Sequence, residues 1–351
     1  MILNVFKIFT PLTIAFFVGI VLAPLLSHYL YKYQAWKKKA GKVDPHGNGT
    51  PIFNKLHEHK EVGTPRMGGI LIWGSALITV LAIWLLSLIL PSDFTSKLNF
   101  LSRNQPWIPF ATLLIGSLVG LIDDWLEVSG NGKYVSGGLP FKHRLTIVLI
   151  LGLLIALWFF FKLDMSAVFV PFVGDLNLGW LFIPFFLVGI TALFSSGVID
   201  GLDGLAGGVM AIIFAAYTGI AYFENQIDLA AFCAVVTGGI LAFLWFNIPP
   251  ARFYMSETGI MGLTLTLTVV AFLTNSVLVL PIIAFPLLAT VLGNVIQLTA
   301  KKYWGRKVFL VAPIHHHFEA IGWPVYKVVM RYWIIGIIMA IIGVVVTLAG
   351  R

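Results

Sequence analysis

Two adjacent aspartates, Asp123 and Asp124, close an apolar run that reads GLIDDWLEV. An acid at the C-terminal end of a helix faces the negative end of the helix dipole, which disfavours it. Paired carboxylates at such a place are explained if they bind a cation, and carboxylate oxygens are ligands that Mg²⁺ prefers. Glu257, the single acid of WFNIPPARFYMSETGIMG, would be the partner ligand that the pair lacks. The alternatives are a solvated helix end for the pair and stabilisation of a helix N-terminus by Glu257.

A second acidic motif, IDGLDGLAGG, contains Asp200, Gly201, Leu202 and Asp203. Its glycines permit tight turns and close approach of the backbone, and a turn that opens a helix offers free N–H groups to a phosphate. Helix capping by Asp203 is the alternative, but a cap accounts for only one of the two aspartates. The motif therefore favours a phosphate-binding turn.

Three consecutive histidines follow later in the chain, in the segment PIHHHFE. Consecutive side chains cannot all point one way on a regular element, so His315, His316 and His317 do not by their spacing predict a zinc site. Imidazoles can neutralise or protonate phosphate oxygens. Asn247 could bind a base or sugar edge through its amide, and Lys60 is a suitable phosphate partner. Carboxylates with Mg²⁺ and cationic groups are what phosphoryl transfer requires, because positioning and charge neutralisation do most of the catalysis.

These residues must be positioned by helices that cross a membrane. The chain has 351 residues, of which 59% are hydrophobic and 11% charged, whereas a soluble domain carries about 25% charged residues. A soluble enzyme, a nucleic-acid-binding domain and a disordered protein are therefore excluded. The single cysteine excludes a disulfide framework and a thiolate metal cluster. We predict an all-α, polytopic integral membrane protein.

Ten apolar segments are long enough to cross a bilayer, which takes roughly 20 residues each. They span 5–27, 67–90, 106–122, 145–161, 178–197, 205–223, 228–246, 259–275, 277–298 and 332–349. Of the 23 lysines and arginines, 18 fall in odd-numbered loops, counted from the loop after the first segment, and 3 in even-numbered loops. Because cytoplasmic loops carry an excess of positive charge, we expect the odd-numbered loops inside and both termini outside. The chain, 1–351, is then a single transmembrane domain whose active site is formed on the cytoplasmic face by loops 28–66, 123–144, 198–204, 247–258 and 299–331.

Six motifs together resemble the polyprenyl-phosphate N-acetylhexosamine-1-phosphate transferase superfamily and, within it, the phospho-N-acetylmuramoyl-pentapeptide transferase family. They are GTPRMGG, LIDDW, DGLDGLAGG, FNIPPARFYM, APIHHHFEAIGWP and VVMRYWIIG, and they extend over nearly the whole chain. PIHHHFE is the most specific part. The resemblance implies transfer of phospho-N-acetylmuramoyl-pentapeptide from its UDP-linked donor to undecaprenyl phosphate, with Mg²⁺ as cofactor, giving lipid I and UMP in peptidoglycan synthesis. It also implies a multi-pass protein of the bacterial inner (plasma) membrane that contacts membrane lipids, can form a homodimer and has no nucleic-acid partner.

By the same resemblance, the functional residues of the family fall on particular positions of this chain. Asp123, Asp124, Glu257 and His315 would be catalytic, with Asp124 and Glu257 as metal ligands. Asp123 would position or deprotonate the lipid phosphate. Substrate would be bound by Lys60, Asp200, Gly201, Leu202, Asp203, Asn247, Tyr254, His316 and His317.

The chain departs from the family pattern at several places, among them a spacing from Lys60 to Gly63 that is one residue longer than usual. Serines stand within Ser195–Gly197 where the family has asparagines, and Glu257 stands where it has an aspartate. Glu127 replaces the lysine of many members, and Arg66 replaces a usual threonine. Three alternatives to the main interpretation are a sister transferase for another UDP-N-acetylhexosamine, a catalytically inactive membrane binding protein, and a transporter. Transporters place charges near the bilayer midplane, whereas the apolar segments of this chain hold almost none.

Overall fold

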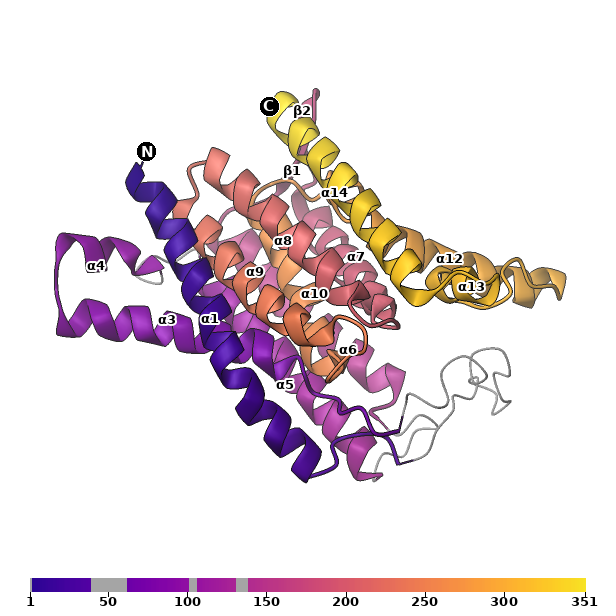
Figure 1. Cartoon of the computed structure of the whole chain (residues 1–351). Coiled ribbons are helices and arrows are strands. Elements are labelled where there is room, and N and C mark those ends of the chain that lie inside the picture. Colours follow the sequence, from indigo (N-terminus) through magenta and orange to yellow (C-terminus); the bar gives the residue numbers. More distant parts are fainter. Residues whose placement is uncertain (1, 39–61, 101–105, 131–137) are drawn as a thin grey trace.

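The computed structural model of the chain describes all residues except 1, 39–61, 101–105 and 131–137. The described residues form a helical bundle with one small hairpin (Figure 1). Within them, nine helices are long and apolar enough to cross a membrane, which confirms the all-α polytopic prediction. They are α1 (Ile2–Lys32), α3 (Ile70–Ile89), α5 (Trp107–Ser129), α6 (Phe141–Lys162), α7 (Phe182–Ser195) with its flanking 3-10 turns η2 (Gly179–Leu181) and η3 (Ser196–Ile199), α8 (Leu205–Phe223), α9 (Ile227–Asn247), α10 (Ser256–Leu273) and α14 (Val325–Ala349).

Shorter elements connect these helices. The helix α4 (Asp93–Leu98) follows α3 and begins with a capping box in which Ser92 and Thr95 bond each other's backbone N–H. Between α6 and α7, strand β1 (Ala167–Val170) pairs antiparallel with β2 (Gly174–Asn177), so that Ala167 faces Asn177. The remaining helices are α11 (Leu280–Ile283), α12 (Phe285–Trp304) and α13 (Ile314–Ala320).

The expected apolar segment 277–298 takes a different form from a single spanning helix. It begins with a turn, continues as α11 and restarts as α12, which runs on to Trp304. Pro281 and Pro286 each lie in the first turn of one of these helices. Proline lacks the N–H that a continuous helix would use and is favoured at a helix start, so the two prolines divide the segment. Lys301 and Lys302 lie in the last turn of α12, which is not among the nine apolar helices.

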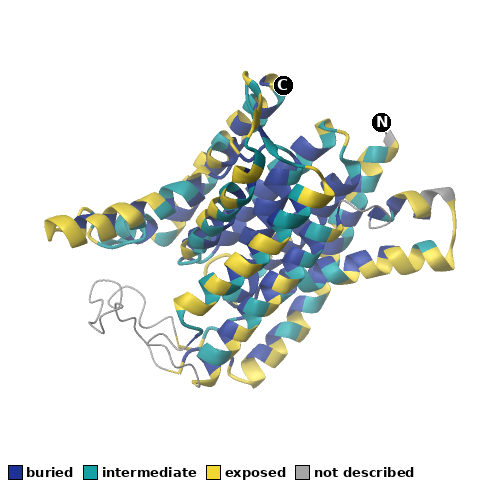
Figure 2. Ribbon diagram, turned by 180° about the vertical axis from the view of Figure 1, so that it is seen from behind, coloured by how far each residue is buried: buried dark blue, intermediate teal, exposed yellow. Residues whose placement is uncertain are grey.

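The core of the bundle is made by α8, α9 and α10, with the other long helices around them. Within an apolar stretch of 18 residues in each helix, buried residues make up 83% for α9 and 89% for α10, but only 28% for α1 and α14. Figure 2 shows the buried residues concentrated in the middle of the bundle and the exposed residues on its outside. Many exposed side chains of the outer helices are large and apolar, such as Phe17, Val21 and Ile341. This arrangement suits lipid as the surrounding solvent.

Helices α5 and α10 pack against each other through small residues. A Cβ added at Gly120 of α5 would lie 2.0 Å from the backbone oxygen of Glu257, and one added at Gly262 of α10 would lie 2.1 Å from Ser117 Oγ. Only residues this small let two helix backbones approach so closely. The crossing therefore brings the C-terminal half of α5 against the N-terminus of α10, where the candidate acids lie.

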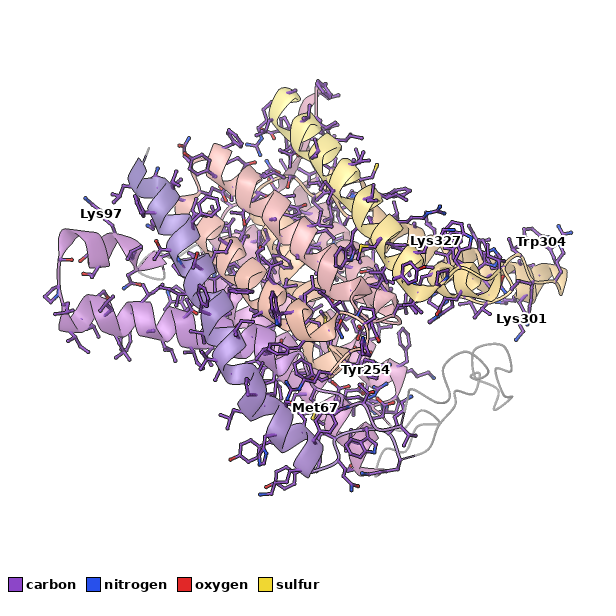
Figure 3. The ribbon with its side chains drawn as sticks, viewed as in Figure 1. Met67, Lys97, Tyr254, Lys301, Trp304 and Lys327 are labelled. Carbon is purple, nitrogen blue, oxygen red and sulfur yellow. The ribbon has the colours of Figure 1, made fainter. Side chains whose placement is uncertain are left out.

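The two termini lie at the same end of the bundle in Figure 1. Met67 and Tyr254 lie toward the other end in Figure 3. That this second end faces the cytoplasm stays a prediction from the distribution of positive charge.

Candidate active site

Asp124 lies near the end of α5 and is completely buried. Its Oδ2 accepts hydrogen bonds from the backbone N–H and the hydroxyl of Thr258, at 2.9 and 2.6 Å. These donors belong to the first turn of α10, where the helix dipole favours a negative charge. Among the described residues, Oδ1 accepts no hydrogen bond and lies 3.6 Å from Nη1 of Arg66. Sequence reasoning missed Thr258 because a threonine after Glu257 has no special signal.

Asp123, the neighbouring carboxylate, is connected to Glu257 through one guanidinium. Its Oδ1 accepts the backbone N–H of Leu139 at 2.5 Å, and its Oδ2 lies 3.5 Å from Nη1 of Arg144. The same Nη1 donates a hydrogen bond to Oε1 of Glu257. Arg144 lies in the first turn of α6 and was not among the predicted site residues. Its only sequence signal is a basic residue at the entry of an apolar run, which is equally typical of a residue that anchors a helix at the membrane interface.

A second ion-pair network lies beside Asp124. Arg66 Nη1 donates to Oε2 of Glu127, and Lys37 Nζ lies 3.1 Å from Oε1 of the same carboxylate. The side chains of Lys37 and Glu127 are 10% and 9% exposed. Arg66 and Glu127, two of the charged residues that the resemblance marks as departures from the family pattern, therefore form an ion pair.

The turn between η3 and α8 braces the segment that leads to α10. Asp200 Oδ2 accepts the backbone N–H of Ser256 at 2.8 Å, and Asp203 Oδ2 accepts that of Ala251 at 3.2 Å. Asn247 Oδ1 accepts the N–H of Gly204 at 2.9 Å, and its Nδ2 donates to the Phe253 carbonyl at 2.9 Å. These side chains hold the glycine turn and the segment 248–256 together. Contact of Asn247 with a base or sugar stays a prediction.

The three histidines lie on α13 and point in different directions, as expected. His315 and His316 are buried, and their ring centroids are 4.3 Å apart. A Cβ added at Gly201 would lie 2.5 Å from His315 Nε2 and 2.8 Å from His316 Nε2, so the DGLDG turn abuts both rings. His316 Nδ1 pairs with Glu319 Oε2 at 2.7 Å. His317 is turned toward the segment before α13, where its Nδ1 accepts the N–H of Leu310 at 3.2 Å.

The other predicted residues take various positions. Tyr254 is tied to the loop before α3, because its N–H donates to the Pro65 carbonyl and its carbonyl accepts from Gly68, both at 2.8 Å; Figure 3 shows it near Met67. Leu202 is buried. The hydroxyls of Ser195 and Ser196 donate back to carbonyls of α7. Lys60 lies outside the described residues, as do parts of loops 28–66 and 123–144.

A continuous series of contacts connects α13 with the aspartate pair. The histidine rings abut Gly201, and the adjacent Asp200 binds the backbone immediately before Glu257. Glu257 is joined to Asp123 through Arg144. Ser256, at the centre of this series, has a φ of 57°, a left-handed conformation that costs energy for a side chain of this kind and that often marks a functional site. The described structure thus gathers carboxylates, guanidinium groups and imidazoles at one place, which can hold a phosphate together with a cation.

The carboxylates can be tested for their fit to a divalent cation. In the part of the chain that the structure describes, no group of three or more His, Cys, Asp or Glu side chains is arranged to hold a metal ion. Oδ1 of Asp124 is nonetheless a buried oxygen without a hydrogen bond from any described residue, which is what a hard cation would use. Glu257 bonds Arg144 and would have to exchange that guanidinium for the ion.

The chain is similar in sequence to known proteins over most of its length. Residues 106–275 match the model of a family described as glycosyl transferase family 4. Over 341 residues, the chain is 32% identical to a phospho-N-acetylmuramoyl-pentapeptide-transferase of Geobacillus thermodenitrificans (strain NG80-2), and the match covers 95% of each protein. A protein with the same name from Listeria innocua is 30% identical over 350 residues, which cover 99% of this chain and all of the relative. The one from Chloroflexus aurantiacus is 32% identical over 298 residues, or 81% of this chain and 77% of the relative.

Proposed function

Because the chain belongs to the phospho-N-acetylmuramoyl-pentapeptide-transferase family, we propose that it transfers phospho-N-acetylmuramoyl-pentapeptide from UDP to undecaprenyl phosphate. The products are lipid I and UMP, and the reaction serves peptidoglycan synthesis at the inner face of a bacterial plasma membrane. The observation that carries the proposal is the junction of Asp123 and Glu257 through Arg144, beside the buried Asp124. The match to relatives over nearly the whole chain supports it.

The proposed reaction is a displacement at phosphorus. An oxygen of the lipid phosphate attacks the β-phosphorus of the UDP-linked donor, the bond from this phosphorus to the bridging oxygen of UMP breaks, and UMP leaves with the electron pair. Asp123 would position the lipid phosphate or accept its proton, since Oδ1 is fixed by the Leu139 N–H. Arg144 and the imidazoles of α13 would neutralise the negative charge of the diphosphate.

We place the Mg²⁺ of this reaction on Asp124 and Glu257. Oδ1 of Asp124 accepts no hydrogen bond from the described residues, which supports this assignment, as does the oxygen-only chemistry of the two side chains. When bound, the ion would neutralise diphosphate oxygens. Arg144 would hold Glu257 until the ion takes its place, and Thr258 would keep Asp124 oriented through Oδ2.

The proposal is tested with purified full-length protein in detergent. UMP release from UDP-N-acetylmuramoyl-pentapeptide should require both undecaprenyl phosphate and Mg²⁺. Asp123→Asn should lower the rate strongly, whereas Asp175→Asn, on the exposed strand β2, should leave it unchanged. Release of UMP from UDP-N-acetylglucosamine but not from the muramoyl-pentapeptide nucleotide would instead support the sister transferase. No release from either donor would support an inactive binding protein.

A further inference from the structure

The helix α12 leaves the bundle and projects sideways from it (Figure 1). With the returning segment it makes a projection, residues 285–313, that we call the α12 arm. The returning segment is tied to the helix by Gln297, whose Oε1 accepts the N–H groups of Val308 and Phe309 and whose Nε2 donates to the Phe309 carbonyl. The arm is therefore a defined hairpin-like unit that holds its residues in place away from the bundle.

The outer face of α12 is apolar. Leu292, Val295, Ile296 and Leu298 are 45–66% exposed. The opposite face, including Leu287, Thr290, Gly293 and Gln297, is buried. An exposed apolar face of this length is unfavourable in water and suits contact with acyl chains. It resembles in chemistry the exposed apolar faces of the outer helices of the bundle.

The end of the arm changes from apolar to basic and aromatic. Lys302, Arg306 and Lys307 are exposed, and Tyr303 and Trp304 are 70% and 65% exposed. Lys301 adds a fourth positive charge, and no Asp or Glu occurs between 285 and 318. Figure 3 shows Lys301 and Trp304 at the outer end of the arm and Lys327 closer to the bundle.

We propose that the tip of the α12 arm binds the headgroups of anionic phospholipids in the bilayer around the protein. Four Lys and Arg residues next to an apolar helix are the usual recognition pattern for anionic headgroups. Tryptophan and tyrosine prefer the same depth, at the boundary of headgroups and acyl chains. An acidic soluble partner would explain the positive charge but not the apolar outer face of α12. This inference does not rest on the proposed function.

The test uses the full-length protein in nanodiscs, with Trp304 as the probe. Its emission is obtained by subtracting the spectrum of Trp304→Phe from that of the parent protein. Discs contain phosphatidylcholine and phosphatidylglycerol in fixed proportion, with bromine on the acyl chains of one or the other at equal mole fraction. We expect about twofold stronger quenching by the brominated anionic lipid, with loss of the difference at high salt.

Variants show whether the preference for the anionic lipid comes from the basic residues of the α12 arm. Lys302→Gln/Arg306→Gln/Lys307→Gln should make quenching by the two brominated lipids equal. Lys162→Gln, an exposed lysine at the end of α6, should leave the preference unchanged. Equal quenching by both lipids in the parent protein would overturn the proposal. Absence of quenching by either lipid would overturn it too, because the tip would then lie outside the bilayer. Its positive charge would then be explained by an acidic soluble partner.

Discussion

Substitution of Arg66 by glutamine tests whether this cation holds the acidic end of α5. Lys37, Arg66, Asp124 and Glu127 carry no net charge as a group, and all but Arg66 have side chains 10% exposed or less. Removing Arg66 leaves the fully buried Asp124 beside the carboxylate of Glu127, which still pairs with Lys37. The perturbation thus creates one excess negative charge in a buried place.

The distance between Arg66 and Asp124 sets the size of the stability loss. Two unit charges 3.6 Å apart interact by about 4–5 kcal/mol at an effective dielectric constant near 20. The Arg66 side chain is 21% exposed, so water screens part of this energy, and we expect a loss of about 2–3 kcal/mol of stability. In the Arg66→Gln background, Glu127→Gln restores neutrality. The stability loss of the double variant should therefore be about 1–2 kcal/mol smaller than the sum of the losses of the two single variants.

Unfolding in detergent, followed by the thermal midpoint of each variant, measures this coupling. Arg306→Gln is the matched control, since Arg306 is exposed at the arm tip, and it should leave the midpoint unchanged. Arg66→Lys should recover part of the loss, because it restores the charge but not the planar fork of donors. If Arg66→Gln were as stable as the parent, or if the two single effects simply added, the compensation between Arg66 and Glu127 would be refuted.

Three further outcomes are expected. Gly120→Ala forces a Cβ to 2.0 Å from the Glu257 backbone and should cost about 1–3 kcal/mol of stability, seen as a lower thermal midpoint. Gly219→Ala is the control, since Gly219 has open space around it, and it should leave the midpoint unchanged. Equal midpoints for the two variants would contradict the close crossing of α5 and α10. Arg144→Gln frees Glu257, so the Mg²⁺ concentration for half-maximal protection against heat should fall, and an unchanged value would exclude competition between guanidinium and ion. Burial raises the pKa of Glu224 to about 7 although Arg351 acts in the opposite direction, so the contribution of Glu224 to stability should decline as pH rises from about 4.5 to about 7. In Glu224→Gln, the thermal midpoint should therefore depend less on pH across this range. The same pH dependence in the variant and the parent would show that Glu224 does not titrate there.

The membrane class and most helix positions could be predicted from the sequence because lipid imposes long uninterrupted apolar runs. The segment 277–298 was harder, since two prolines five residues apart divide a run whose hydropathy alone looks continuous. Grouping of the acids at one end followed from the charge bias of the loops, and the contacts around Asp123, Glu257 and Asp200 agree with it.

The partners of these acids could not be predicted in the same way. Arg144 and Glu257 are 113 positions apart, and nothing in either local sequence points to the other. Contact of Asn247 and Asp203 with substrate stays a prediction, but their hydrogen bonds to the backbone of segment 248–256 had no sequence signal. Hydrogen bonds to the backbone depend on the path of a loop, which local residue types leave open.

The position of Arg144 in the chain determines the order in which its two contacts can form during synthesis. Asp123 and Arg144 are 21 positions apart, on two consecutive helices, so they emerge from the ribosome almost together. Glu257 is synthesised much later. During insertion, the contact between Asp123 and Arg144 can neutralise both groups while α10 does not yet exist. The same guanidinium would thus serve first as a counter-ion for membrane entry of α5 and α6, and only afterwards as the bridge to Glu257.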